Sequence, residues 1–182
     1  TPRTGQISMD TSRSAGASGA GAPAGTRMPG GTAEMTTNRL QQLHAAGQSV
    51  WLDYIDRAIL RDGTLQRRIR EDAVMGMTSN PTIFEKALAE GTEYDEQLAG
   101  APRELGAKAL FELLATDDVG SACDIFRPVY HASSGGDGFV SIEVSPGVAN
   151  DEAASVAEGR RLWKTVDRPN LLVKIPATQE GL

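Results

Sequence analysis

This sequence has little cysteine, no long apolar run and no excess of positive charge. Each of these absences excludes some classes of protein. Its 182 residues contain a single cysteine, Cys123, which excludes an internal disulfide, and no Cys/His spacing fits a zinc site. No apolar stretch approaches the roughly 18–20 residues of a membrane span, and no signal-peptide pattern is present. Lys and Arg number 18 against 24 Asp and Glu, a net charge of −6, which disfavours nucleic-acid and membrane-surface partners because both need a basic face. We expect a soluble, cytoplasmic globular protein.

Large apolar residues are scarce at the N-terminus as well. Among residues 1–34 only Ile7, Met9 and Met28 qualify, within a run rich in Gly, Ala, Ser and Thr. Such a segment buries too little apolar surface to offset an ordering cost of about 1–2 kcal/mol per residue for the backbone alone. We therefore predict a disordered tail or translated leader over residues 1–34. Met35 is then the expected natural start, and residues 35–182 form the folded region.

The rest of the chain alternates short apolar runs with longer segments of helical pattern. The apolar runs have strand length and fall at residues 49–55, 73–78, 138–144 and 171–175. The helical segments begin with a capping box at Asn38 and continue at residues 57–72 (interrupted near Asp62), 81–91, 102–130 and 150–166. Near-continuous apolar strands separated by helices predict an α/β fold with a parallel sheet covered on both faces.

A polar or charged residue lies at or near the C-terminal end of each predicted strand. These residues are Asp53, Thr78 with Asn80, Glu143 and Lys174. Burying a charge is costly unless the charge is paired or functional, and the C-terminal strand ends of a (β/α) barrel form its active-site face. Any one of these residues alone is better explained as a satisfied polar group in the core. Their repetition at four strand ends indicates an active site.

Lys174 is the sharpest candidate. It lies between Leu171–Val173 and Ile175, so its aliphatic stem is expected to be enclosed. Burial disfavours the charged form of an amine and makes it a usable nucleophile toward a carbonyl, which predicts a Schiff base with a ketone or aldehyde. Nearby carboxylates would oppose this effect by favouring the ammonium form. The alternative is a lysine at a strand end whose amine reaches water.

Schiff-base chemistry moves protons at several steps, and the carboxyl groups of Asp53 and Glu143 can supply them from separate strands. The alternative for Asp53 is a helix N-cap that follows a short strand. For Glu143 it is a solvent-facing residue on an edge strand. Thr78 and Asn80 can hydrogen-bond substrate hydroxyls, although Asn80 equally suits an N-cap before Pro81.

Two longer motifs contain these residues. GMTSNPTIFEKA, Gly76 to Ala87, and LLVKIPAT, Leu171 to Thr178, resemble the two signatures of the transaldolase family. WLDYIDR from Trp51 and the Ile-Glu-Val around Glu143 fall where that family has its first and third strands. The resemblance covers residues 35–182. It implies a class I aldolase-type (β/α)8 TIM barrel that uses no metal and no organic cofactor.

The resemblance also implies a reaction. Transaldolases of the pentose phosphate pathway move a dihydroxyacetone unit from sedoheptulose 7-phosphate to glyceraldehyde 3-phosphate, so sugar phosphates are the expected substrates. Lys174 matches the Schiff-base nucleophile, and Glu143 matches the carboxylate that works through a catalytic water. Asp53 matches the aspartate assigned to proton transfer in C–C cleavage, and Thr78 and Asn80 match positions that contact the bound dihydroxyacetone moiety. The full-length protein is compatible with a homo-oligomer.

The sequence departs from the family in length. A complete barrel typically needs about 250 residues, and only the first four β/α units are found here. We therefore expect a truncated chain that is inactive alone, corresponding to a single-domain transaldolase of the actinobacterial or plant kind. Two alternatives stay open: the N-terminal part of a fusion with glucose-6-phosphate isomerase, and a non-catalytic half-barrel whose unpaired strand edges join a partner chain.

Overall fold

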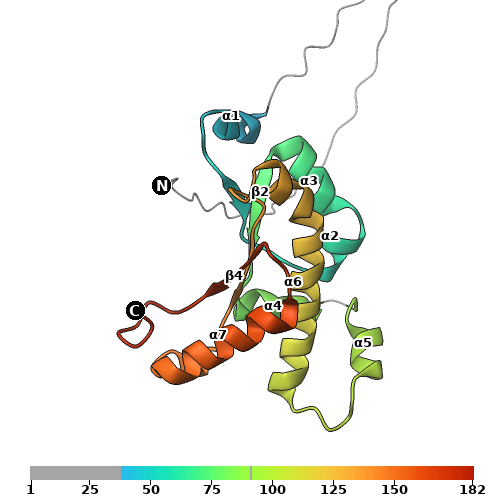
Figure 1. Cartoon of the computed structure of the whole chain (residues 1–182). Coiled ribbons are helices and arrows are strands. Elements are labelled where there is room, and N and C mark those ends of the chain that lie inside the picture. Colours follow the sequence, from blue (N-terminus) through green and yellow to red (C-terminus); the bar gives the residue numbers. More distant parts are fainter. Residues whose placement is uncertain (1–37, 91) are drawn as a thin grey trace, which may run out of the picture.

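The computed structural model describes residues 38–90 and 92–182, and in this part of the chain helices and strands alternate (Figure 1). The predicted tail over residues 1–34 and the expected start at Met35 lie outside the described residues. In chain order, the elements are α1 (Arg39–Ala45), β1 (Val50–Leu52), α2 (Arg57–Arg61), α3 (Thr64–Asp72), β2 (Val74–Thr78), α4 (Pro81–Glu90), α5 (Asp95–Gly100), α6 (Ala107–Ala132), β3 (Val140–Glu143), the 3-10 helix η1 (Pro146–Val148), α7 (Glu152–Val166) and β4 (Leu171–Lys174).

Local signals in the sequence explain where several helices begin. The predicted capping box is confirmed: the Asn38 side chain accepts the Gln41 N–H at 2.9 Å, and the Gln41 side chain accepts the Asn38 N–H at 3.0 Å. The predicted interruption near Asp62 is also confirmed, because Gly63 adopts a φ of +82° between α2 and α3. Such a left-handed conformation suits glycine, since it has no Cβ.

Two predicted boundaries were wrong, and one helix was missed. The first strand ends at Leu52 rather than residue 55, because Ile55 turns into the core and Asp56 caps α2 by accepting the Ile59 N–H at 3.0 Å. Helix α6 begins at Ala107 rather than residue 102. The short helix α5 was not predicted, since its six residues contain a single large apolar residue and give no helical period.

The four strands form one parallel sheet in the order β1-β2-β3-β4. Parallel connections between neighbouring strands are almost always right-handed, so this sequential order sends every connecting helix to the same face. The core lies between that face and the helices. From the sheet it contains Val74, Met77, Val140, Ile142, Val144 and Leu171, and from the connecting segments Ile55, Leu60, Leu65, Val119, Phe126 and Leu162.

Helices cover one face of the sheet, and the prediction of two covered faces was wrong in the part of the chain described. Leu172, which alternates with the core residue Leu171, lies on the opposite face and is 42% exposed. Sequential parallel strands with helices on one side are the arrangement of a (β/α) barrel. The described residues therefore supply four strands of such a barrel, with the inward face open.

A buried ionic network joins the start of α2 to the middle of α6. Arg57 Nε donates to Asp118 at 2.8 Å, Tyr94 donates its hydroxyl to the same carboxylate at 2.7 Å, and the Arg57 guanidinium lies over the Tyr94 ring. Arg57 and Asp118 are each 2% exposed. Burial raises the pKa of both Asp118 and Tyr94. The network anchors the segment that follows β1, where Asp53 is located.

The helices of the described residues are too short or too polar to cross a membrane. Helix α7 lies against the N-terminal half of α6 (Figure 1), and ion pairs join the two helices through Lys108 with Glu158 and Arg161 with Glu112.

Candidate active site

The C-terminal ends of β1 and β2 bring Asp53 and Thr78 together. Leu52 pairs with Met77 in the sheet, so the residues that follow them, Asp53 just beyond β1 and Thr78 at the end of β2, point to the open face at the same level. The Thr78 hydroxyl donates a hydrogen bond to the Asp53 carboxylate, and both residues are half-buried. A carboxylate held in this way has a fixed orientation toward the open face.

Asn80 lies two residues beyond Thr78, at the start of α4. Its backbone carbonyl accepts the Phe84 N–H at 3.3 Å, which is the bond that an N-cap residue receives. Pro81 opens the helix, as predicted. Asn80 is half-buried and lines a depression at the strand ends, so the capping position and a place near substrate are compatible.

The ends of β3 and β4 bring Glu143 and Lys174 together. The two residues are direct partners in the parallel ladder, and the Lys174 Nζ lies 3.1 Å from Oε2 of Glu143. This distance is within reach for direct proton transfer between an amine and a carboxyl group. The Lys174 side chain is 37% exposed and the Glu143 side chain 30%. The expectation that Lys174 is enclosed was therefore wrong for the described residues. The described strands supply one wall around the amine, and the open face leaves the other side to solvent.

Three of the candidate residues share one open depression. Asp53, Asn80 and Glu143 line it together with Pro81, Thr82, Lys86 and Pro146. Thr78 joins this group through Asp53, and Lys174 joins it through Glu143. The structure therefore places all five sequence-predicted residues at one end of the sheet. Lys174 and Thr78 themselves lie outside the lining of the depression.

The positions of these residues bear on the structural alternatives. Asp53 does not cap α2, because Asp56 does so. Glu143 does not lie on an edge strand, because β3 is hydrogen-bonded to both β2 and β4. The alternative for Lys174 fits in part, since more than a third of its side chain reaches solvent while its amine contacts Glu143.

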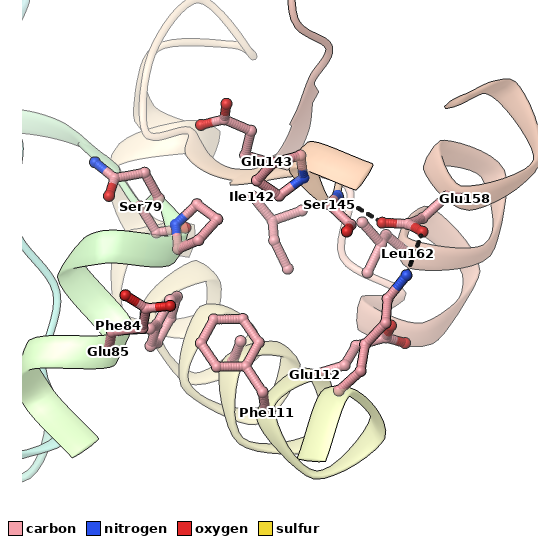
Figure 2. A pocket seen from close by; sticks show the side chains of 15 residues that line it. Ser79, Phe84, Glu85, Phe111, Glu112, Ile142, Glu143, Ser145, Glu158 and Leu162 are labelled. Carbon is pink, nitrogen blue, oxygen red and sulfur yellow. Dashed lines mark hydrogen bonds and ion pairs between the residues drawn. The ribbon is translucent and has the colours of Figure 1, made fainter. Parts of the chain in front are cut away.

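A second cavity of about 230 Å³ lies behind the strand ends, on the helix side (Figure 2). Phe84, Phe111, Ile142 and Leu162 form its apolar walls, and the rings of Phe84 and Phe111 meet edge to face. In Figure 2, Ile142 points toward Phe111 and Glu143 points the opposite way. Asn80 and Glu143, two of the candidate residues, also line this cavity.

Three further residues were missed by the sequence analysis. Lys86 brings a second ammonium group to the rim of the depression from α4. Ser141 is two residues before Glu143, so strand alternation could have indicated that it faces the same side; its hydroxyl is buried without a hydrogen-bond partner in the structure. The Trp51 ring packs against Gly76. A Cβ added at Gly76 would lie 2.5 Å from carbon atoms of that ring, which explains the glycine in the first motif.

Within the described ranges, no group of three or more His, Cys, Asp and Glu side chains is arranged to hold a metal ion. The chemistry available at the strand ends is that of an amine, two carboxyl groups, a hydroxyl and an amide. These groups can form a covalent bond to a carbonyl and move protons.

Comparison with known proteins gives a consistent picture. Residues 50–182 match the family described as Transaldolase/Fructose-6-phosphate aldolase. The chain is 54% identical over 144 residues to a transaldolase from Thermobifida fusca and 47% identical over 146 residues to a transaldolase from Thiobacillus denitrificans. It is 50% identical over 144 residues to a transaldolase from Mycobacterium tuberculosis.

These alignments cover most of this chain and a smaller part of each relative. They include 79% of the chain and 39% of the Thermobifida protein, and 80% of the chain and 41% of the Thiobacillus protein. The chain thus spans about 40% of the length of the curated relatives that it matches.

Proposed function

The chain belongs to the transaldolase family, and on that premise we propose that Lys174 forms a Schiff base with a keto sugar phosphate and carries a dihydroxyacetone unit. The proposed reaction moves this unit from sedoheptulose 7-phosphate to glyceraldehyde 3-phosphate, as in the pentose phosphate pathway. The observation that carries the proposal is the 3.1 Å approach of the Lys174 amine to Glu143 at the ends of two neighbouring parallel strands.

The proposed chemistry begins at Lys174. Glu143 accepts a proton from the ammonium, and the free amine attacks the C2 carbonyl of the ketose to form a carbinolamine. Loss of the carbinolamine hydroxyl as water, after a proton is returned to it, gives the Schiff base. Glu143 is the group nearest the amine for these transfers, at 3.1 Å. The same steps in reverse release the product ketose.

Cleavage of the C3–C4 bond needs a base for the C4 hydroxyl. Asp53 is the proposed base, because its carboxylate faces the open side of the sheet and Thr78 holds it in place. The bonding electrons pass into the Schiff base, which leaves a three-carbon enamine on Lys174 and releases the aldehyde. Addition of a second aldehyde consumes that enamine, and Asp53 returns its proton to the new hydroxyl.

Thr78 and Asn80 are proposed to contact the dihydroxyacetone hydroxyls. Both are half-buried at the rim of the open face, and Asn80 lines the depression that also contains Asp53 and Glu143. The reaction needs no metal and no organic cofactor, since the amine itself supplies the covalent chemistry. The cytoplasm is the proposed location, since the substrates are phosphorylated sugars.

The test is reductive trapping of the 182-residue chain with fructose 6-phosphate and borohydride, followed by peptide mapping. The sequence contains four lysines, Lys86, Lys108, Lys164 and Lys174, so the adduct can be assigned to one of them. We expect the adduct on Lys174. Lys174→Met should abolish it, whereas the matched change Lys164→Met, at an exposed position of α7, should leave it unchanged.

An adduct spread over the lysines in proportion to their exposure would contradict the proposal. A folded chain with no adduct on Lys174 would favour the non-catalytic half-barrel instead. The expectation that these residues alone do not turn over stays a prediction, and steady transfer by the purified chain would overturn it.

A further inference from the structure

The Glu158 side chain reaches from α7 to the end of β3. Its Oε1 accepts the backbone N–H of Ser145 at 2.6 Å, and its Oε2 lies 3.3 Å from the Lys108 Nζ on α6 (Figure 2). The side chain is 12% exposed, compared with 66% for Lys108. A carboxylate this deeply placed is held mainly by the backbone N–H that it accepts.

The Ser145 N–H is the first donor beyond the β3–β4 ladder. One residue earlier, the Val144 N–H donates to the Lys174 carbonyl at 3.1 Å. Glu158 therefore supplies the acceptor for the first backbone N–H after the last hydrogen bond between the two strands. An N–H bonded to an ionised carboxylate is roughly twice as strongly held as one bonded to a neutral acceptor. This bond fixes the place where β3 leaves the sheet, two residues beyond Glu143.

We propose that Glu158 is a positioning residue, which holds Glu143 against Lys174 through the backbone of Ser145. The proposal rests on the proposed function, because it concerns the same amine and carboxylate. Glu143 faces the open side of the sheet, whereas Glu158 approaches from the helix side (Figure 2). Glu158 thus acts on the catalytic pair without contacting it.

Two features of Glu158 can be separated by mutation. Glu158→Gln keeps an oxygen that accepts the Ser145 N–H but loses the ion pairs with Lys108 and, at 4.0 Å, with Arg161. Lys108→Met removes the shorter of these ion pairs and leaves the carboxylate in place. Glu158→Ala removes the hydrogen bond and both ion pairs. A role in positioning predicts that only the last variant alters the catalytic pair.

The measurement is the rate of reductive trapping on Lys174 with dihydroxyacetone as the probe, at a saturating concentration and at equal fraction folded. We expect Glu158→Ala to be about tenfold slower, since a misplacement of about 1 Å can cost about a hundredfold. The trapping rates of Glu158→Gln and Lys108→Met should stay within about twofold of that of the unaltered chain, because the Lys108 side chain is 66% exposed and solvent screens its ion pair.

Ser145 offers a second route that leaves Glu158 intact. Its φ of −56° suits proline, so Ser145→Pro removes the N–H donor with little change of backbone. This variant should slow trapping as Glu158→Ala does, while Ser145→Ala, which keeps the N–H, should not. The pair keeps the test valid if Glu158→Ala fails to fold.

Equal trapping rates for Glu158→Ala and the unaltered chain would overturn the proposal. So would equal losses in Glu158→Ala, Glu158→Gln and Lys108→Met, because the ion pair would then be responsible. If the unaltered chain forms no adduct, the proposed function fails, and amide exchange at Ser145 decides the present question. Faster exchange in Glu158→Ala alone supports the hydrogen bond as the restraint, and unchanged exchange contradicts it.

Discussion

Side chains at the strand ends lie in two pairs, each formed across neighbouring strands. Thr78 fixes Asp53 between β2 and β1, and Lys174 faces Glu143 between β4 and β3. In the proposed reaction, Thr78 sets the orientation of the base Asp53, and Glu143 receives a proton from Lys174. Residue types at strand ends predicted these four positions. Burial of Lys174 could not be predicted in the same way, because it depends on side chains from the opposite side of the sheet.

Cys123 gives a prediction that is independent of catalysis. The thiol is fully buried in α6, and burial raises its pKa to about 12. The thiolate is the reactive form, so almost none exists at pH 8. A disulfide reagent should leave the folded chain unmodified for as long as it stays folded and should modify one thiol per chain in denaturant. Rapid modification under native conditions would show that this part of α6 opens.

The turn between α6 and β3 leaves no space for a side chain at Gly138. Gly138 has a φ of +81°, and a Cβ placed there would lie 2.3 Å from the Tyr130 backbone nitrogen. The last glycine of the glycine-rich stretch before β3 is thus explained by packing of the chain against α6. This is a structural role, which agrees with the absence of any phosphate-loop pattern there.

The substitution Gly138→Ala should therefore lower the free energy of unfolding severely. Gly47 is the matched control, because its φ is +85° but no atom lies within 4 Å of a Cβ placed there. Gly47→Ala should cost about 1–2 kcal/mol for the left-handed backbone alone. Gly138→Ala should cost at least about 2 kcal/mol more, since the backbone must shift. Urea unfolding measures both, and equal losses would mean that the turn adapts freely.

Asp124 on α6 ties that helix to the start of β4. Arg168 Nε and Nη2 donate to its two carboxylate oxygens at 2.7 and 2.9 Å, and Arg127 donates at 3.0 Å. Arg168 holds the pKa of Asp124 below its ordinary value. A lowered pKa means that the pair stabilises the fold above the unfolded value of about 4 and loses this effect as the pH falls through the lowered pKa.

Asp124→Asn should cost up to about 1 kcal/mol at pH 7, because the side chain is half exposed and solvent screens the pair. The cost should shrink in 1 M salt and disappear at acidic pH, where the carboxyl group is protonated. Unfolding free energies at the two pH values, combined in a cycle with Arg168→Met, measure the coupling. A cost that stays constant with pH would contradict an ionic origin.

At the scale of elements, apolar runs and capping residues predicted the four strands, the capping box at Asn38 and the start of α4 at Pro81. The end of β1 could not be predicted, because Ile55 looks like a strand residue until its place in the core is known. The short helix α5 could not be predicted either, because its sequence has no hydrophobic period. Tyr94, the residue before it, is buried and donates its hydroxyl to Asp118.

At the scale of the whole molecule, the sheet carries its helices on one side and its catalytic candidates on the other. Alternating strands and helices predicted the parallel sheet but not which face is covered, because that follows from the order of strands in space. The strand order β1-β2-β3-β4 supplies this information. The register of the paired strands explains why Asp53, Thr78, Glu143 and Lys174 share the open face.

The central claim is that Lys174 takes a dihydroxyacetone unit as a Schiff base. Its most direct test is the mass of the Lys174 peptide after reaction with fructose 6-phosphate and reduction with borohydride. The account predicts a three-carbon adduct on Lys174 together with release of glyceraldehyde 3-phosphate, a half-reaction that does not require turnover. An adduct confined to other lysines, or a folded chain whose Lys174 peptide stays unmodified, would contradict it.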